Sequence, residues 1–104
     1  MESIEILNIL RKLHNNINIK QRELASQLDY SLGKVNYIIK NLQKKGLIKI
    51  YNFNKNKNKK NYVYLLTPTG IKQKTKLTIN FMKKISKEYE LMQSELKKRK
   101  NIEL

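Results

Sequence analysis

The side chains most capable of specific chemistry lie in the segment 31–41, where hydroxyl, amide and ammonium groups are interspersed with apolar residues. Val35, Ile38, Ile39 and Leu42 recur at helical spacing and predict the buried face of a helix. The outer face of that helix is left with Ser31, Leu32, Gly33, Lys34, Asn36, Tyr37, Lys40 and Asn41. These residues are the ones we predict to contact a ligand.

Three of these side chains match the hydrogen-bonding groups of base pairs. An asparagine such as Asn36 can form two hydrogen bonds with the edge of adenine, and Lys34 or Lys40 can donate to the acceptors of guanine. The plain alternative is that lysines on an exposed helical face are only solvated. The pattern therefore indicates recognition of DNA bases, with solvation as the competing interpretation.

Four further residues suit other parts of DNA. Leu32 or Tyr37 can contact a thymine methyl group, although Tyr37 would equally well pack against a neighbouring hairpin. Gly33 has no side chain and lets the backbone approach closely. Ser31 lies where the helix begins, and a helix N-terminus favours phosphate.

A second basic segment, 54–61, contains only asparagine and lysine. Its lysines are Lys55, Lys57, Lys59 and Lys60. We predict that they contact the DNA backbone or the minor groove. The alternative is a low-complexity loop produced by codon bias, which would still place positive charge near DNA.

The combinations of residues that form catalytic or metal sites are missing from the sequence. There is no cysteine, and the one histidine, His14, lies at the end of an expected helix and is interpreted as a surface or capping residue. Asp29 and the later glutamates show no metal-ligand spacing with it, and no Gly-rich phosphate loop or G-x-S-x-G motif occurs. We expect a protein that is not an enzyme and has no metal or cofactor.

Charge points to a polyanionic partner. The 104 residues include 23 lysines and arginines but 8 acids, a formal net charge of +15. Such an excess indicates nucleic acid, or less often an anionic membrane surface. No stretch approaches the roughly 20 apolar residues that span a bilayer, and the segment 1–10 lacks the basic region of a secretory signal. We expect a cytoplasmic protein that does not bind membranes.

Three short helices are expected in the first half of the chain. Apolar periodicity predicts the first over 3–14, and the second begins near Lys20 with Gln21 on its outer side. The third opens with Ser31 as N-cap and stops at Gly46, a residue suited to the left-handed conformation.

A hairpin and a long helix complete the chain. Segments 47–53 and 62–67 are rich in β-branched and aromatic residues and predict two strands. Thr67 as N-cap and Pro68 in the first turn then begin a helix that runs to about Lys100.

The last helix carries an apolar stripe with a heptad repeat. The stripe consists of Ile71, Thr75, Thr78, Met82, Ile85, Tyr89, Met92 and Leu96. We expect its first part to rest on the preceding domain and its second part to meet another copy of the chain. The predicted dimer interface is Leu77, Phe81, Met82, Ile85, Tyr89, Met92 and Leu96. Whether the two helices run parallel or antiparallel is left open.

The segment from Lys20 to Ile50 resembles the DNA-binding core of bacterial regulators of the MarR type. The shared features are the small Ala25 at a helix crossing, the tight turn after Leu28 and the capping Ser31. Residues 64–70, which read Y-L-L-T-P-T-G, are similar to the segment that leads from the wing into the C-terminal helix. The sequence S-L-G-K-V-N-Y at 31–37 is similar to small MarR-type regulators found beside exopolysaccharide biosynthesis genes.

This resemblance implies a mainly α fold with a small β-hairpin, of the α+β class. Residues 1–70 would form a winged helix-turn-helix domain and residues 71–104 a dimerisation helix. The third helix would enter the major groove of an inverted-repeat operator, and exopolysaccharide genes would be the targets. Larger MarR proteins have an additional N-terminal helix that frames a small-molecule pocket; this chain starts after it, so we expect no such effector pocket.

Two other functions fit the same composition. One is a basic winged-helix protein that binds RNA or the ribosome, although RNA recognition usually uses stacking surfaces and 2′-hydroxyl contacts. The other is a coiled-coil structural protein that binds DNA without sequence preference. The leading prediction is a sequence-specific regulator of transcription that binds double-stranded DNA as a homodimer.

Overall fold

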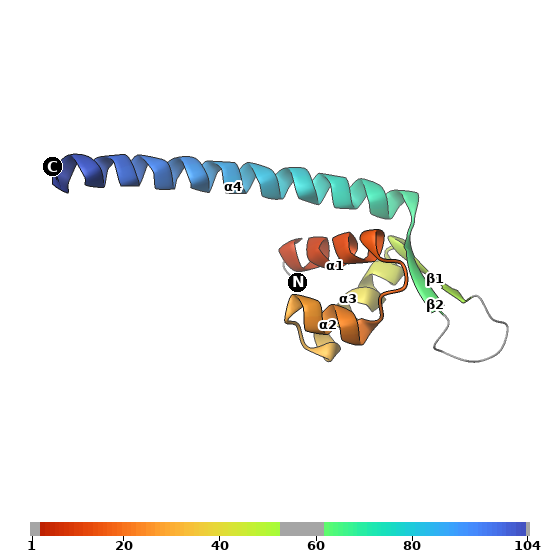
Figure 1. Ribbon diagram of the computed structural model, residues 1–104. Coiled ribbons are helices and arrows are strands. Elements are labelled where there is room, and N and C mark those ends of the chain that lie inside the picture. The colour runs from red at the N-terminus through yellow and green to blue at the C-terminus, as the bar shows by residue number, and fades with distance from the viewer. Residues whose placement is uncertain (1–2, 53–61, 104) are drawn as a thin grey trace.

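The computed structural model describes residues 3–52 and 62–103. Three short helices, a two-stranded hairpin and one long helix follow each other along the chain (Figure 1). The elements are α1 (Ser3–Asn15), α2 (Gln21–Leu28), α3 (Leu32–Lys44), β1 (Ile48–Asn52), β2 (Tyr62–Leu66) and α4 (Pro68–Glu103). This order confirms the predicted fold class, a winged helix-turn-helix followed by a long C-terminal helix.

The core lies between the three short helices and the hairpin. Each of α1 and α3 contributes four buried apolar side chains, and α2 contributes one. They are Leu7, Ile9, Leu10 and Leu13 from α1, Leu24 from α2, and Val35, Ile38, Ile39 and Leu42 from α3. The inner face predicted for the third helix is therefore confirmed, and burial of that face leaves the opposite face of α3 toward solvent.

The ends of α2 and α3 are set by local chemistry. Asp29 caps α2 in the left-handed conformation with φ 56°, and the Ser31 hydroxyl accepts a hydrogen bond from the Lys34 backbone N–H at 3.1 Å. Gly46, with φ 72°, ends the turn after α3. These caps confirm Ser31 as the N-cap and Gly46 as the stop, and they define the tight turn that orients α3.

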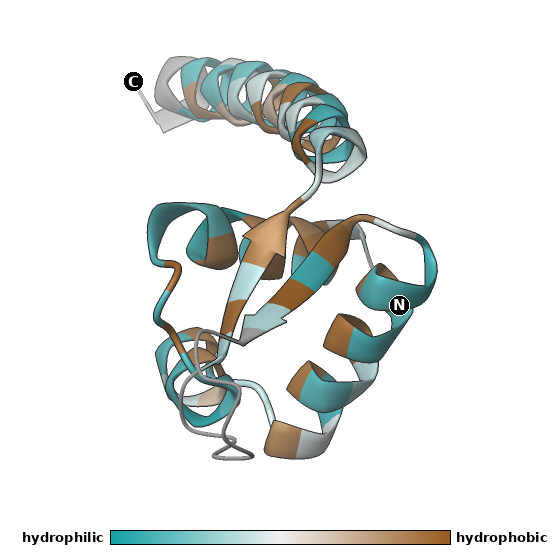
Figure 2. Cartoon of the chain, turned by 90° about the vertical axis from the view of Figure 1, so that its right-hand side faces the viewer, coloured by the Kyte–Doolittle hydropathy of each residue, from teal (hydrophilic) through white to brown (hydrophobic). Residues whose placement is uncertain are grey.

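The hairpin forms the wing. β1 and β2 pair antiparallel, from Ile48 opposite Leu66 to Asn52 opposite Tyr62. The two strands lie against the helices at one side of the domain (Figure 2). The four lysines predicted at the tip, at positions 55, 57, 59 and 60, lie outside the described residues.

The connection from the wing to α4 is closely packed. The Thr67 hydroxyl accepts from the Gly70 N–H at 3.0 Å and donates to the Gly46 carbonyl at 2.6 Å, so it caps α4 as predicted. Gly70 passes directly over Leu47, where an added Cβ would lie 2.0 Å from the Leu47 carbonyl oxygen. This close passage explains the glycine.

Only the first part of α4 rests on the domain. This part contacts α1, where Lys74 Nζ lies 2.6 Å from His14 Nδ1. The half-buried residues of this part recur along one face: Gln73, Lys74, Leu77, Thr78 and Phe81. Ile71 is 42% exposed and Thr75 is exposed, so the expectation that the first part of the heptad stripe makes this contact is wrong for both. The half-buried face is offset from the start of the stripe around the helix, which leaves Ile71 and Thr75 toward solvent, whereas Thr78 of the stripe is half-buried.

The rest of α4 projects beyond the domain (Figure 1). Residues 82–99 are all exposed, and the molecule measures 71 × 26 × 21 Å. The 36 residues of α4 correspond to about 54 Å of helix. In the described part of the chain, no helix combines the length and the apolar character needed to cross a membrane.

Candidate nucleic-acid interface

The outer face of α3 presents most of the predicted residues to solvent. Ser31, Gly33 and Lys40 are exposed, as are Leu32 at 44% and Tyr37 at 62%. The exposure of Tyr37 argues against the alternative in which it packs on the hairpin. A ligand that lies along α3 would therefore meet hydroxyl, apolar, aromatic and ammonium groups together.

Asn36 differs from these residues because a neighbouring helix holds it. The Asn36 Nδ2 donates to Gln21 Oε1 at 3.2 Å, and both side chains are half-buried, as is that of Asn41 further along α3. One N–H and the carbonyl oxygen of the Asn36 amide are not used in this bond. Adenine needs one donor and one acceptor from an asparagine, so the amide keeps the groups required.

Gln21 connects Asn36 to the wing. Its Nε2 donates to the Tyr64 hydroxyl of β2 at 2.9 Å. The expectation that Gln21 lies on the outer side of the second helix is therefore wrong. At the first position of α2, Gln21 lies between α3 and the wing, and a chain of two hydrogen bonds relates the amide of Asn36 to Tyr64.

The wing strand is also anchored by Lys20, the residue before α2. Lys20 Nζ donates to the Tyr62 carbonyl at 2.5 Å and lies 4.3 Å from the centre of the Tyr62 ring. The rings of Tyr62 and Tyr64 meet edge to face, 5.3 Å apart at 74°. These contacts hold β2 against the start of α2.

Tyr64 is a titratable group of the site whose pKa is clearly shifted. Burial raises the pKa of Tyr64 to about 12 from the ordinary 10.0; the hydrogen bond from Gln21 acts in the opposite direction, and Tyr62 adds to the rise. Its side chain is only 2% exposed. Tyr64 is therefore a neutral hydroxyl that accepts from Gln21 at physiological pH.

Lys34 makes contacts within the protein as well as facing solvent. Its ammonium group pairs with the Glu5 carboxylate of α1 and lies 5.0 Å from the centre of the Tyr30 ring. The Tyr30 hydroxyl in turn accepts from Asn8 Nδ2 at 3.2 Å. Lys34 thus links α1 to the start of α3, so any contact of this lysine with guanine has to compete with Glu5.

Sequence reasoning missed Gln21, Tyr64 and Glu5 as partners of the outer face. The position of Gln21 at the start of the expected second helix could have indicated such a contact, because a side chain there can reach a neighbouring element. Tyr64 was recognised as a strand residue, but its partner is 43 positions away in the sequence. Periodicity does not show such pairs.

The predicted dimer residues occupy two environments. Leu77 is half-buried and packs against the core of its own domain, and Phe81 is half-buried beside α1. Met82, Ile85, Tyr89, Met92 and Leu96 are between 51% and 65% exposed. The second group forms an apolar surface that the described part of this chain does not cover.

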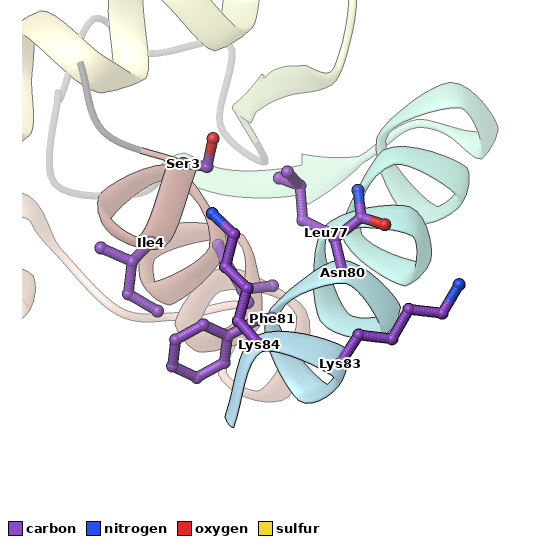
Figure 3. Close-up of a pocket in the computed structure, with 8 residues that line it drawn as sticks. Ser3, Ile4, Leu77, Asn80, Phe81, Lys83 and Lys84 are labelled. Carbon is purple, nitrogen blue, oxygen red and sulfur yellow. The ribbon is translucent and has the colours of Figure 1, made fainter. Parts of the chain in front are cut away.

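A groove of about 720 Å³ opens between the start of α1 and the middle of α4 (Figure 3). Its walls are Ser3, Ile4 and Leu7 on one side and Leu77, Asn80, Phe81, Lys83 and Lys84 on the other. The expectation that the chain has no small-molecule pocket of the larger MarR type remains a prediction. Among the described residues, no three histidine, cysteine or acidic side chains gather in a possible metal site.

Known proteins share both the domain and the fold. A family model described as winged helix-turn-helix DNA-binding matches residues 3–49. Wild-type ZitR of Lactococcus lactis, in complex with DNA, superimposes with a TM-score of 0.67 at 23% identity, over 88% of this chain and 60% of that one. MarR of Staphylococcus aureus, in complex with salicylate and kanamycin, superimposes with a TM-score of 0.65 at 18% identity, over 82% of this chain and 55% of that one.

A MepR variant of Staphylococcus aureus bound to an oligodeoxyribonucleotide gives a TM-score of 0.61 at 23% identity, over 92% of this chain and 73% of that one. The chain spans less than two thirds of the ZitR and MarR chains. No curated protein matches the sequence significantly. The agreement between helix order, wing and long last helix leads to one conclusion: residues 3–49 are similar to winged helix-turn-helix DNA-binding domains, and the chain has the winged helix-turn-helix fold of the MarR-family regulators.

Proposed function

We propose that the protein is a regulator of transcription that binds a specific double-stranded DNA sequence as a homodimer. The observation that carries this proposal is the outer face of α3, where exposed Lys40 and Tyr37 lie beside an Asn36 amide held by Gln21. Such a face offers donors, acceptors and apolar groups that the major groove can discriminate.

DNA rather than RNA is favoured by the position of the two aromatic side chains of β2, whereas Tyr37 of α3 and Tyr51 of β1 are exposed. Tyr64 is buried, and Tyr62 is half-buried with Lys20 over its ring, so neither provides an open platform for stacking a base. The solved neighbours include ZitR in complex with DNA and MepR bound to an oligodeoxyribonucleotide, and we extend that kind of ligand to this chain.

The exposed apolar residues of α4 support the proposed homodimer. Each domain carries one α3, so two copies related by a two-fold axis would present two such helices to successive major grooves. The expected operator is an inverted repeat with half-sites about one helical turn, or a multiple of it, apart. The resemblance to regulators encoded beside exopolysaccharide genes makes those promoters the first to examine. We propose a cytoplasmic location, which agrees with the proposed DNA ligand.

A competition assay distinguishes this function from the alternatives. The protein is titrated onto the DNA upstream of its own gene in the presence of random DNA, or of structured RNA of equal length. We expect a footprint with two-fold symmetry that random DNA and RNA do not compete away. Equal competition by random DNA would favour the non-specific structural protein, and stronger competition by RNA would favour the RNA-binding protein.

A further inference from the structure

The heptad stripe of α4 has an unusual distribution of side-chain sizes. Its first half contains Thr75 and Thr78, whereas its second half contains Tyr89 and Met92. Each threonine hydroxyl donates to a carbonyl one turn earlier in the same helix, Thr75 to Ile71 at 3.1 Å and Thr78 to Lys74 at 2.7 Å. Because these hydroxyls are already bonded, the two threonines can face a partner as small side chains.

Antiparallel pairing of two α4 helices matches small residues with large ones. With the two-fold axis between Met82 and Ile85, residue 75 lies opposite 92 and residue 78 opposite 89. Thr75 then faces Met92 of the partner subunit, and Thr78 faces the partner's Tyr89. Pairs of a large and a small side chain pack evenly across a helix interface. In a parallel pair in register, each residue of the stripe would face its own copy. Two threonines would then meet at positions 75 and 78, and two large side chains would meet at positions 89 and 92, so the interface would be packed unevenly.

The charges on α4 favour the same direction. Residues 72–87 include six lysines and no acid, and residues 88–95 include three glutamates and no base. Antiparallel pairing about this axis places the acidic segment opposite residues 72–79, where three of the lysines lie. A parallel pair would place the two lysine-rich segments side by side, with Lys72 and Lys74 directly beside the stripe, and like charges near one another are unfavourable.

Antiparallel pairing also keeps the basic C-terminal end of α4 away from other positive charges. Residues 97–100 carry four positive charges and would lie opposite residues 67–70, which carry none. Lys74 and Glu95 each directly precede a residue of the stripe, so they flank the same edge of the helix. In an antiparallel pair that edge meets its own copy, which brings Lys74, whose Nζ also lies 2.6 Å from His14 Nδ1 of its own chain, near Glu95 of the partner subunit.

We infer that the exposed stripe of α4 is covered by α4 of a second copy of this chain, running antiparallel, with Thr75 packed on the partner's Met92 and Thr78 on the partner's Tyr89. This inference rests on the proposed function for one point only, that the protein is a dimer. It adds which residues form the dimer interface and in which direction the two helices run. It also sets where the two DNA-binding domains lie, one toward each end of a shared pair of helices.

Engineered disulfides test the direction of the helices, and the absence of native cysteine makes the experiment clean. Thr75→Cys and Met92→Cys are made singly and together in the full chain. Positions 75 and 92 of one helix are about 25 Å apart, too far for a disulfide within one chain. Thr75→Cys with Glu90→Cys, which moves the second thiol off the stripe, is the matched control.

For the antiparallel interface, mild oxidation should leave each single variant uncrosslinked. A mixture of the two single variants, distinguished by a mass tag, should form mixed dimers, and the Thr75→Cys/Met92→Cys variant should crosslink at least ten-fold more than its control. Crosslinking of Thr75→Cys with itself would overturn the antiparallel direction. A monomer by light scattering at micromolar concentration, or no crosslink in any variant, would overturn the interface.

The same samples separate this inference from the proposed function. Operator binding is measured on the unmodified protein and on the reduced variants. If Thr75→Cys crosslinks with itself while the protein still binds its operator as a dimer, the antiparallel interface is wrong and the proposed function stands. If the mixed disulfide forms but operator and random DNA bind equally, the interface is supported and the proposed function is wrong.

Discussion

The hydroxyl of Tyr64 in the wing strand lies 2.9 Å from Nε2 of Gln21 at the start of α2. Gln21 Oε1 also accepts a hydrogen bond from Asn36 of α3 at 3.2 Å. The side chain of Gln21 therefore bridges the buried Tyr64 of the wing and the Asn36 amide that we expect to contact a DNA base. This connection has consequences for specificity and for pH dependence.

Loss of the Tyr64 hydroxyl should reduce specificity more than affinity for DNA in general. In Tyr64→Phe, Gln21 loses its acceptor and holds Asn36 less firmly, so we expect operator binding to weaken by about 1 kcal/mol with little change on random DNA. The loss should concentrate on one A·T pair in each half-site, measured by competition with single-base operator variants.

Tyr30→Phe is the matched control for this experiment. This variant also removes a tyrosine hydroxyl that accepts a hydrogen bond from a side-chain amide, in this case from Asn8 at 3.2 Å. The Tyr30 hydroxyl has no part in the hydrogen bonds that join Tyr64, Gln21 and Asn36. We expect its preference for the operator over random DNA to be unchanged. Equal loss on operator and random DNA in Tyr64→Phe would show that the wing does not position Asn36.

The raised pKa of Tyr64 predicts a loss of stability at high pH. The folded state holds the phenolic proton up to about pH 12, whereas the unfolded chain releases it near 10.0. The stability from the protonated hydroxyl is therefore complete below pH 10 and is lost as the pH rises toward 12. Relative to Tyr64→Phe, the free energy of unfolding should fall by about 2 kcal/mol over this range, as measured by urea denaturation.

An optical titration provides a second measure of the same group. Tyrosinate absorbs near the red edge of the tyrosine band, and one of the six tyrosines should titrate last. That late step should be missing in Tyr64→Phe. If both proteins lose stability in parallel between pH 10 and 12, the hydroxyl of Tyr64 is not responsible.

Two glycines should respond to alanine in opposite directions. Gly70→Ala places a Cβ against the Leu47 carbonyl, so we expect a loss of about 1 to 3 kcal/mol of stability. Gly33 has nothing within 4 Å of the position of a Cβ, so Gly33→Ala in α3 should raise stability by about 0.5 to 1 kcal/mol. If α3 approaches DNA closely at Gly33, the same variant should weaken operator binding while its melting temperature rises.

Lys34 and Lys40 should separate into a structural and a DNA-contacting lysine. Lys34 pairs with Glu5, so Lys34→Ala should cost about 1 kcal/mol of stability, measured by thermal denaturation. Lys40→Ala should leave stability unchanged and weaken operator binding by about 1 to 3 kcal/mol, with a smaller effect on random DNA. Unchanged operator affinity in Lys40→Ala would remove this residue from the recognition surface.

The lysines at the tip of the hairpin should act on all DNA sequences alike. Replacing Lys55, Lys57, Lys59 and Lys60 by alanine should weaken operator and random DNA equally. The slope of log affinity against log salt should fall by about 0.9 for each phosphate that the variant no longer neutralises. Unchanged affinity and slope at low salt would mean that this segment does not bind DNA.

The sequence by itself determined the helices, the strands and their order. The spacing of Val35, Ile38 and Ile39 marks the inner face of α3, because a helix places residues three and four apart on one side. Ser31, Gly46 and Thr67 define helix ends through local chemistry, which does not depend on distant residues. The outer face of α3 follows from the inner one, so the candidate site was largely accessible from the sequence.

Only the tertiary structure decided which polar groups meet. Gln21 joins Tyr64, and Glu5 joins Lys34, because the packing of α1, α2 and the wing brings together residues far apart in the sequence. The docking of α4 likewise depends on the position of α1, which directs Leu77 and Phe81 inward and leaves Ile71 and Thr75 outward. A periodic pattern specifies which face of a helix is apolar, but not which neighbour covers it, because that depends on the relative placement of whole elements.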